Sequence, residues 1–110
     1  MTQWISDAEA ERALDFLRDK AVEIGEARKQ MVLAEKMTKR IVALEKKRSD
    51  AKTQDAKEQD ALGSEAYLAA IVAEAEAAGN FETLRAYRDA AAAKLEIWRS
   101  LVATARSMSK

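Results

Sequence analysis

The sequence predicts an all-α protein built from long helices, and three observations support this fold class. The 110 residues contain no proline and only three glycines, and alanine, glutamate, lysine, leucine and arginine are abundant. β-Branched residues are few and never alternate with polar residues over the length of a strand. Apolar residues recur at steps of three and four, which places them on one side of a helix. We therefore expect a single helical domain over residues 1–110, folded as a helical hairpin or bundle and completed by oligomerisation.

The first helix is expected from about residue 7 to about residue 48. Ser6 and Glu9 have the spacing of a capping box, which marks the start of a helix. An apolar stripe then runs from Leu14 to Leu44. At 1.5 Å per residue this helix would measure about 60 Å, which is long for a monomer of this size. Part of the stripe should therefore contact another chain or the rest of this one.

A polar linker is expected over about 49–63, and two further helices over about 65–78 and 81–107. The linker prediction follows from a weakly patterned polar composition, with at most a helical turn at its centre. Ser64 is the expected cap of the short helix, and Gly79 is expected to end it, because glycine is the usual residue just after a helix.

The last helix has the clearest period, a heptad seam with one arginine in it. Trp98 lies on this seam and is expected to pack between helices, while Arg99 and Arg106, seven residues apart, lie beside the seam and face outward. The residues predicted to form the core or an oligomer contact are Leu14, Leu17, Ile24, Met31, Ile41, Leu44, Leu84, Leu95, Trp98 and Val102.

Several function classes are excluded by what the sequence lacks. Without histidine or cysteine, zinc sites of the usual kind and Ser-His or Cys-His nucleophiles cannot be built. There is no glycine-rich phosphate loop, and the carboxylates lie on highly charged helices, where solvation explains them. No run of about 18 apolar residues and no secretory signal is visible. We therefore expect no enzyme, metal, cofactor or membrane association, and a cytoplasmic location.

The charges fall into blocks, although their sum is zero. Residues 28–52 carry nine basic and three acidic side chains, and residues 53–84 carry one basic and seven acidic. Helices that merely solvate themselves can show such blocks, and the carbonyl end of a helix also favours cations. Nine cations exceed what the helix dipole needs, so the block also predicts a surface that follows a phosphate backbone. The candidate nucleic-acid-binding residues are Lys36, Lys39, Arg40, Lys46, Lys47, Arg48, Lys52, Arg99 and Arg106.

Three segments, ALDFLRDKA, LEKKRSDAK and SEAYLAAIVAEAEAAGNFETLRAYRDAAAAKLEIWRSL, resemble the small helical proteins of phage recombination modules and, distantly, the UvsY-type recombination mediators. The resemblance covers residues from about 8 to about 107, although this chain is shorter and its linker is acidic. It implies a protein that binds single-stranded DNA, forms ring-like oligomers and helps to load a recombinase onto DNA coated by single-strand-binding protein. It also implies that the basic residues from Lys36 to Arg48 contact DNA and that Trp98 belongs to the helical framework.

Two hypotheses from different classes remain open on the sequence. In the first, the chain is a non-enzymatic recombination accessory protein of a phage, acting in the bacterial cytoplasm on single-stranded DNA. In the second, it is a helical adaptor or inhibitor that binds another protein and no nucleic acid. The basic block would then contact an acidic surface of a partner or of a neighbouring subunit.

Overall fold

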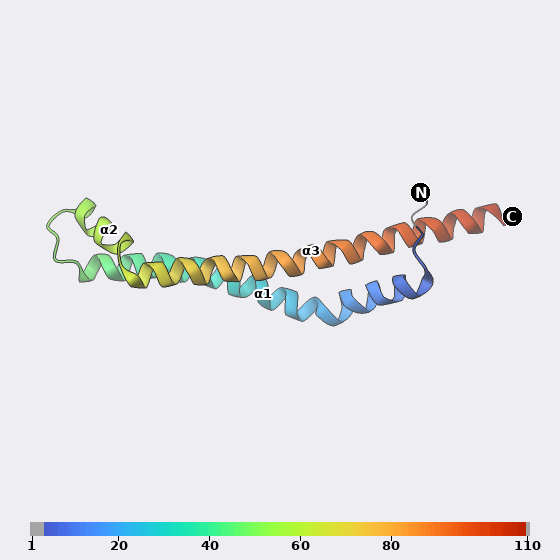
Figure 1. The fold of residues 1–110 in the computed structure, drawn as a ribbon, viewed down its shortest axis with the longest axis horizontal. Helices are drawn as coiled ribbons and strands as arrows, with labels where there is room; N and C mark the ends of the chain where they lie inside the picture. Colours follow the sequence, from blue (N-terminus) through green and yellow to red (C-terminus); the bar gives the residue numbers. More distant parts are fainter. Residues whose placement is uncertain (1–3, 110) are drawn as a thin grey trace. The chain divides into compact units, whose positions relative to one another are not determined.

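A computed structural model describes residues 4–109 as three α-helices, which confirms the all-α fold class. They are α1 (Asp7–Arg48), α2 (Gln54–Leu62) and α3 (Glu65–Met108) (Figure 1). The chain divides into two compact units. The turn unit, Gly25–Glu82, holds the second part of α1, all of α2 and the first part of α3. The terminal unit holds α1 up to Ile24 and α3 from Thr83 onward.

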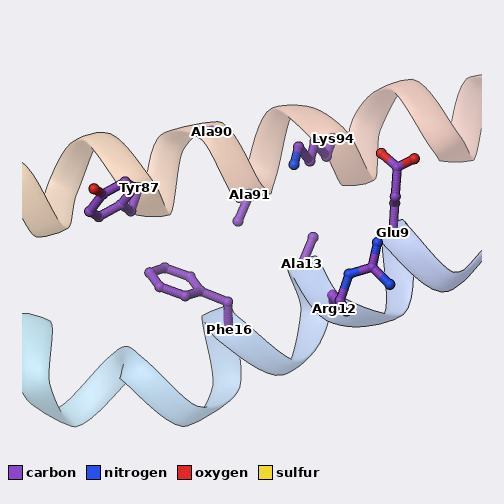
Figure 2. Close-up of a pocket in the computed structure, with 8 residues that line it drawn as sticks. All are labelled: Glu9, Arg12, Ala13, Phe16, Tyr87, Ala90, Ala91 and Lys94. Carbon is purple, nitrogen blue, oxygen red and sulfur yellow. The ribbon is translucent and has the colours of Figure 1, made fainter. Parts of the chain in front are cut away.

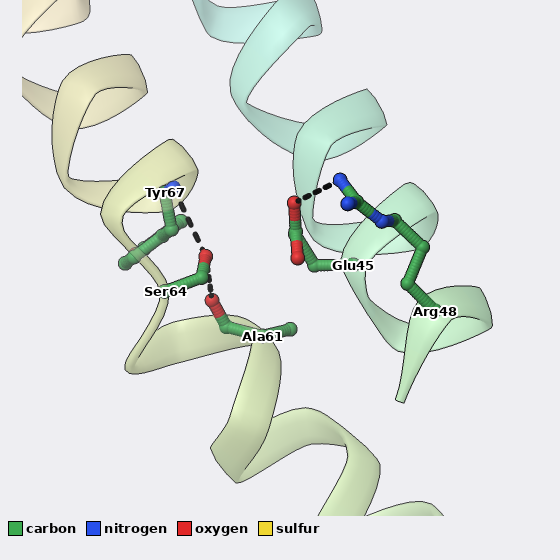
Figure 3. A network of polar contacts seen from close by, with 5 residues as sticks. All are labelled: Glu45, Arg48, Ala61, Ser64 and Tyr67. Atoms are coloured by element: carbon green, nitrogen blue, oxygen red, sulfur yellow. Dashed lines mark hydrogen bonds and ion pairs between the residues drawn. The ribbon is translucent and has the colours of Figure 1, made fainter. Parts of the chain in front are cut away.

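Side-chain caps start α1 and α3 where the sequence predicts them. The Oγ of Ser6 accepts a hydrogen bond from the N–H of Glu9 at 3.1 Å. At the start of α3, the Oγ of Ser64 accepts from the N–H of Tyr67 at 3.1 Å and donates to the carbonyl of Ala61 at 2.7 Å (Figure 3). Each bond satisfies a backbone group that a helix end leaves unpaired, so both starts are fixed locally.

The predicted linker over 49–63 is wrong in its central part, where α2 forms. Thr53 caps this helix, because its side chain accepts from the N–H of Ala56 at 3.1 Å. Ser49 donates to Asp60 at 2.5 Å, which ties the end of α1 to α2. Ala61 is fully buried, so the helix is held by packing as well as by its cap. The expected helical turn at this place is thus a nine-residue helix.

The predicted break at Gly79 is also wrong, because α3 continues through it without interruption. No glycine among residues 4–109 has a positive φ, which the predicted glycine stop would need. The buried and partly buried positions of α3 explain the continuity. They keep one heptad phase on both sides of Gly79, at Tyr67, Ala70, Glu74, Ala77, Phe81, Leu84, Arg88, Ala91, Leu95, Trp98 and Val102. A helix with an unbroken seam can keep its packing through a glycine, so the seam decides the outcome.

In the turn unit, α1 and α3 meet along seams that mix small residues with larger ones. The Oγ1 of Thr38 donates to the carbonyl of Ala70 at 3.5 Å, which fixes the register of the two helices. The carbonyl of Ala34 also accepts from Thr38, at 3.0 Å. The seam of α1 in this unit comprises Ala27, Met31, Ala34, Thr38, Ile41 and Glu45, all buried or partly buried. Small side chains allow close backbone approach but bury little apolar area.

The terminal unit is held by small buried residues and two aromatic contacts. Ala13 and Ala91 are buried, and the ring of Phe16 meets that of Tyr87 edge to face at 6.4 Å between centroids. The indole Nε1 of Trp98 donates to the Oδ1 of Asp7 at 2.8 Å, joining α3 to the first residue of α1. Trp98 is thus partly buried and bonded to the other helix of this unit.

Two of the predicted core residues lie outside the core of the single chain. Leu14 is 52% exposed and Leu44 is 40% exposed, whereas Ile24 is buried. The seam of α1 passes through neighbouring positions instead, through the buried Ala13 next to Leu14 and the partly buried Glu45 next to Leu44. The remaining predicted core residues are partly buried: Leu17, Met31, Ile41, Leu84, Leu95, Trp98 and Val102. Within residues 4–109, none of the helices combines the length and the apolar character that a membrane-spanning segment needs.

Candidate nucleic-acid interface

Four cations of the turn unit form a straight row on the outward side of α1. Lys29, Lys36, Arg40 and Lys47 each follow a seam residue by two positions, which is about 200° around the helix. All four are exposed. Their spacings of seven, four and seven residues correspond to rises of about 10, 6 and 10 Å along the helix axis. We call this row the basic ridge.

A second row of cations runs along one flank of the ridge. Arg28, Lys39 and Lys46 each follow a seam residue by one position, about 100° around the helix. Arg28 and Lys39 are exposed, and Lys46 is partly buried. Lys39 also lines a groove of about 670 Å³ between α1 and α3, together with Tyr67 and Glu74. The two rows place seven cations on the outward side and one flank of α1, where Val32, Leu33 and Glu35 also lie.

Most of these cations are not neutralised within the described part of the chain. Arg48 has a partner, since its Nη1 lies 3.4 Å from the Oε1 of Glu45 (Figure 3). The structure of residues 4–109 contains no ion pair for the ridge residues or for Lys39 and Lys46. An unpaired exposed ammonium or guanidinium group can exchange its counterions for phosphates without first breaking a contact. The ridge is therefore electrostatically available.

The other predicted nucleic-acid-binding residues lie elsewhere. Lys52 is exposed in the segment that connects α1 to α2, close in sequence to the end of the ridge. Arg99 and Arg106 belong to the terminal unit, and Arg99 is paired with Glu96 at 2.8 Å. The structure brings Lys36, Lys39, Arg40, Lys46, Lys47 and Arg48 together on one helix. It gives no joint site that includes Arg99 and Arg106.

Two cations of these rows, Arg28 and Lys29, were missing from the predicted set. The signal that identifies Lys29 is its helical spacing, because it lies seven residues before Lys36 on the same row. Arg28 lies eleven residues before Lys39, which is three helical turns on the same flank. Periodicity among the cations, rather than their number, would have found both residues.

A different surface in the terminal unit combines aromatic and charged side chains. A groove of about 230 Å³ has an alanine floor at Ala13 and Ala91, with the Phe16 and Tyr87 rings at one end (Figure 2). Glu9, Arg12 and Lys94 line its other end (Figure 2). The basic ridge carries no aromatic side chain, so it can attract phosphates but cannot stack bases.

No protein-family model, curated protein or solved structure matches the chain.

Proposed function

We propose that this chain binds single-stranded DNA through the outward side of α1 and assists recombination without catalysing a reaction. The observation that carries the proposal is the basic ridge, a row of exposed cations that have no acidic partner among the described residues. Such a row follows a polyanionic backbone by releasing its counterions, and it needs no pocket. The resemblance to UvsY-type mediators supports single-stranded DNA as the polyanion and the loading of a recombinase as the purpose.

The cations are densest at the end of α1, and this part carries most of the proposal. Lys39, Arg40, Lys46 and Lys47 lie within two and a half helical turns, and Lys52 follows in the connecting segment. Glu45 lies in the seam facing α3, whereas Asp50 and Asp60 lie beyond the last turn of α1. A strand crossing the last turns of α1 would therefore meet five or six cations before it reaches these carboxylates.

The test is fluorescence anisotropy with a labelled oligothymidylate at low and moderate salt. We expect binding whose log affinity falls by about 0.7 per phosphate contact for each log unit of salt. The triple variant Arg40→Glu, Lys46→Glu and Lys47→Glu should lose this binding and its salt dependence. A control with the same net charge, Arg12→Glu, Lys20→Glu and Lys94→Glu, places the reversals in the terminal unit and should keep most of the affinity. Absence of binding by the unaltered protein at micromolar concentration and low salt would overturn the proposal.

A second candidate function, a helical module that binds another protein, is favoured by the exposed apolar side chains. Leu33 and Met37 on α1, and Leu68 and Val72 on α3, are all more than 40% exposed in the turn unit. Exposed apolar side chains that lie close together often mark protein–protein contact surfaces. The triple variant separates the two functions, because loss of a protein complex together with unchanged oligonucleotide affinity would favour the module.

A further inference from the structure

The turn unit carries an exposed apolar surface on α3 that is bordered by carboxylates. Leu68, Val72, Ala75 and Gly79 each lie two positions from a seam residue of α3, so they point away from α1. Leu68 is 58% exposed and Val72 is 48% exposed. Exposed carboxylates and no cations accompany them on this part of α3, including Glu76. We call the residues Glu65, Leu68, Val72, Ala75, Glu76 and Gly79 the acidic face.

A matching surface of opposite charge lies on the outward side of α1. A hollow of about 470 Å³ has Gly25, Val32 and Leu33 as its apolar part, and Arg28, Lys29 and Lys36 as its rim. Val32 and Leu33 are exposed. We call these six residues the basic face. It occupies the beginning of the basic ridge and ends before Arg40.

The two faces cannot meet within one chain. α1 and α3 pack against each other along their seams, and the residues of each face lie about 100–200° from the seam of their own helix. Both faces therefore lie outside the contact between the two helices. Only a second molecule can bring an acidic face onto a basic face.

We propose that the acidic face of one copy packs on the basic face of a second copy. Carboxylates then border cations, and the exposed Leu68 and Val72 are covered by Val32 and Leu33. The contact is heterologous, because it joins two different surfaces, so every copy keeps one free face of each kind. Repetition of such a contact gives a ring if the rotation closes and a filament if it does not.

The dimensions and the glycines agree with this contact. The apolar positions of the acidic face run from residue 68 to residue 79, and the basic face runs from residue 25 to residue 36. Each spans twelve residues, or about 18 Å of helix. A Cβ added at Gly25 or at Gly79 would meet nothing within 4 Å beyond its chain neighbours and the adjacent backbone of its own helix, so packing between helices of one chain does not require either glycine. Glycine weakens a helix relative to alanine, and a close approach by a second helix accounts for both positions.

The experiment uses charge reversal and measures molar mass by light scattering and sedimentation, without DNA. One variant carries Glu65→Lys and Glu76→Lys, and the other carries Lys29→Glu and Lys36→Glu. Each should weaken self-association about tenfold or more, because like charges then face each other. A mixture of the two variants should recover assembly, since the two unaltered faces remain complementary and the two reversed faces are complementary to each other. A chain with all four changes should assemble like the unaltered protein.

Two further variants guard against effects on folding. The reversals Asp55→Lys and Glu58→Lys on α2 lie in the same unit but on neither face, and they should leave assembly unchanged. Gly79→Leu should keep the helix content measured by circular dichroism and lower self-association. The proposal fails if the unaltered protein stays monomeric at all concentrations, or if the two reversed variants do not associate when mixed. Because Arg40 and Lys47 lie outside the basic face, oligonucleotide binding can survive that failure.

Discussion

Replacing Trp98 by phenylalanine and by alanine separates two contributions of this side chain to the stability of the terminal unit. Phenylalanine keeps an aromatic ring on the seam but removes the indole N–H that donates to Asp7 at 2.8 Å. Alanine removes both the ring and the hydrogen bond. The two substitutions therefore measure the bond alone and the bond together with the packing.

The structure sets the expected magnitudes. A hydrogen bond to a charged group contributes about 1.5–3 kcal/mol, and solvent screening at this exposed contact lowers that to about 1 kcal/mol. Replacing a fully buried tryptophan by alanine costs about 3–5 kcal/mol. Since Trp98 is only partly buried, we expect Trp98→Ala to lower the free energy of unfolding by about 2–3 kcal/mol. Trp98→Phe should lower it by about 1 kcal/mol.

Urea unfolding followed by far-ultraviolet circular dichroism gives both values, at one protein concentration because self-association would otherwise shift the midpoint. Trp4 is the matched control, since it is 65% exposed and Trp4→Ala should change the free energy of unfolding by less than about 0.5 kcal/mol. Equal effects of Trp98→Ala and Trp4→Ala would show that Trp98 does not hold the two helices together.

Two other substitutions test the caps and the seam. Ser64→Ala removes the acceptor for the N–H of Tyr67 and should lower the free energy of unfolding by about 1 kcal/mol in the same assay. Amide hydrogen exchange at the start of α3 should also become faster, and unchanged exchange there would contradict the capping role. Ile24→Ala should cost about 2–4 kcal/mol because Ile24 is buried, whereas Leu14→Ala should cost about 1 kcal/mol or less because Leu14 is half exposed. If Leu14→Ala cost more than Ile24→Ala, the assignment of the side of α1 that faces α3 would be wrong.

The helix starts were predictable because they depend on neighbouring residues alone. Ser6 and Ser64 lie three positions before the amide that each one accepts from, so the sequence contains the complete interaction. The nine-residue α2 was missed because its residues have weak periodicity. Its stability comes partly from the burial of Ala61, and no local sequence pattern predicts that this residue is buried.

The prediction at Gly79 failed because a local signal was weighed above a longer one. Glycine often ends a helix, but the heptad phase of α3 is the same before and after this residue. Packing against α1 offsets the small loss of helix stability that one glycine causes, so α3 stays continuous. The phase was readable from the sequence, and a count of the seam through residues 67–102 would have corrected the boundary.

The candidate interface was predictable in composition but not in geometry. The sequence showed a cluster of cations from Arg28 to Lys52. Helical spacing determines which of them share a row, but which row points outward depends on which side of α1 faces α3. The apolar pattern included Leu14 and Leu44 on that side. The observed seam keeps Ile24, Met31 and Ile41 of that pattern but takes Glu45 in place of Leu44. Lys29, Lys36 and Lys47 lie on the side of α1 opposite this seam.

The sequence by itself determined that this chain is helical, where its first and last helices begin or are capped, and where its charges lie along the chain. These properties depend on groups within one or two turns of each other, so they need no information about distant residues. Only the tertiary structure decided which side of each helix is covered, because apolar residues occur on more than one side of α1 and the covered side depends on residues of α3 that are distant in sequence. That choice turns one set of cations and apolar groups outward, and the surfaces proposed for DNA and for a second copy both follow from it.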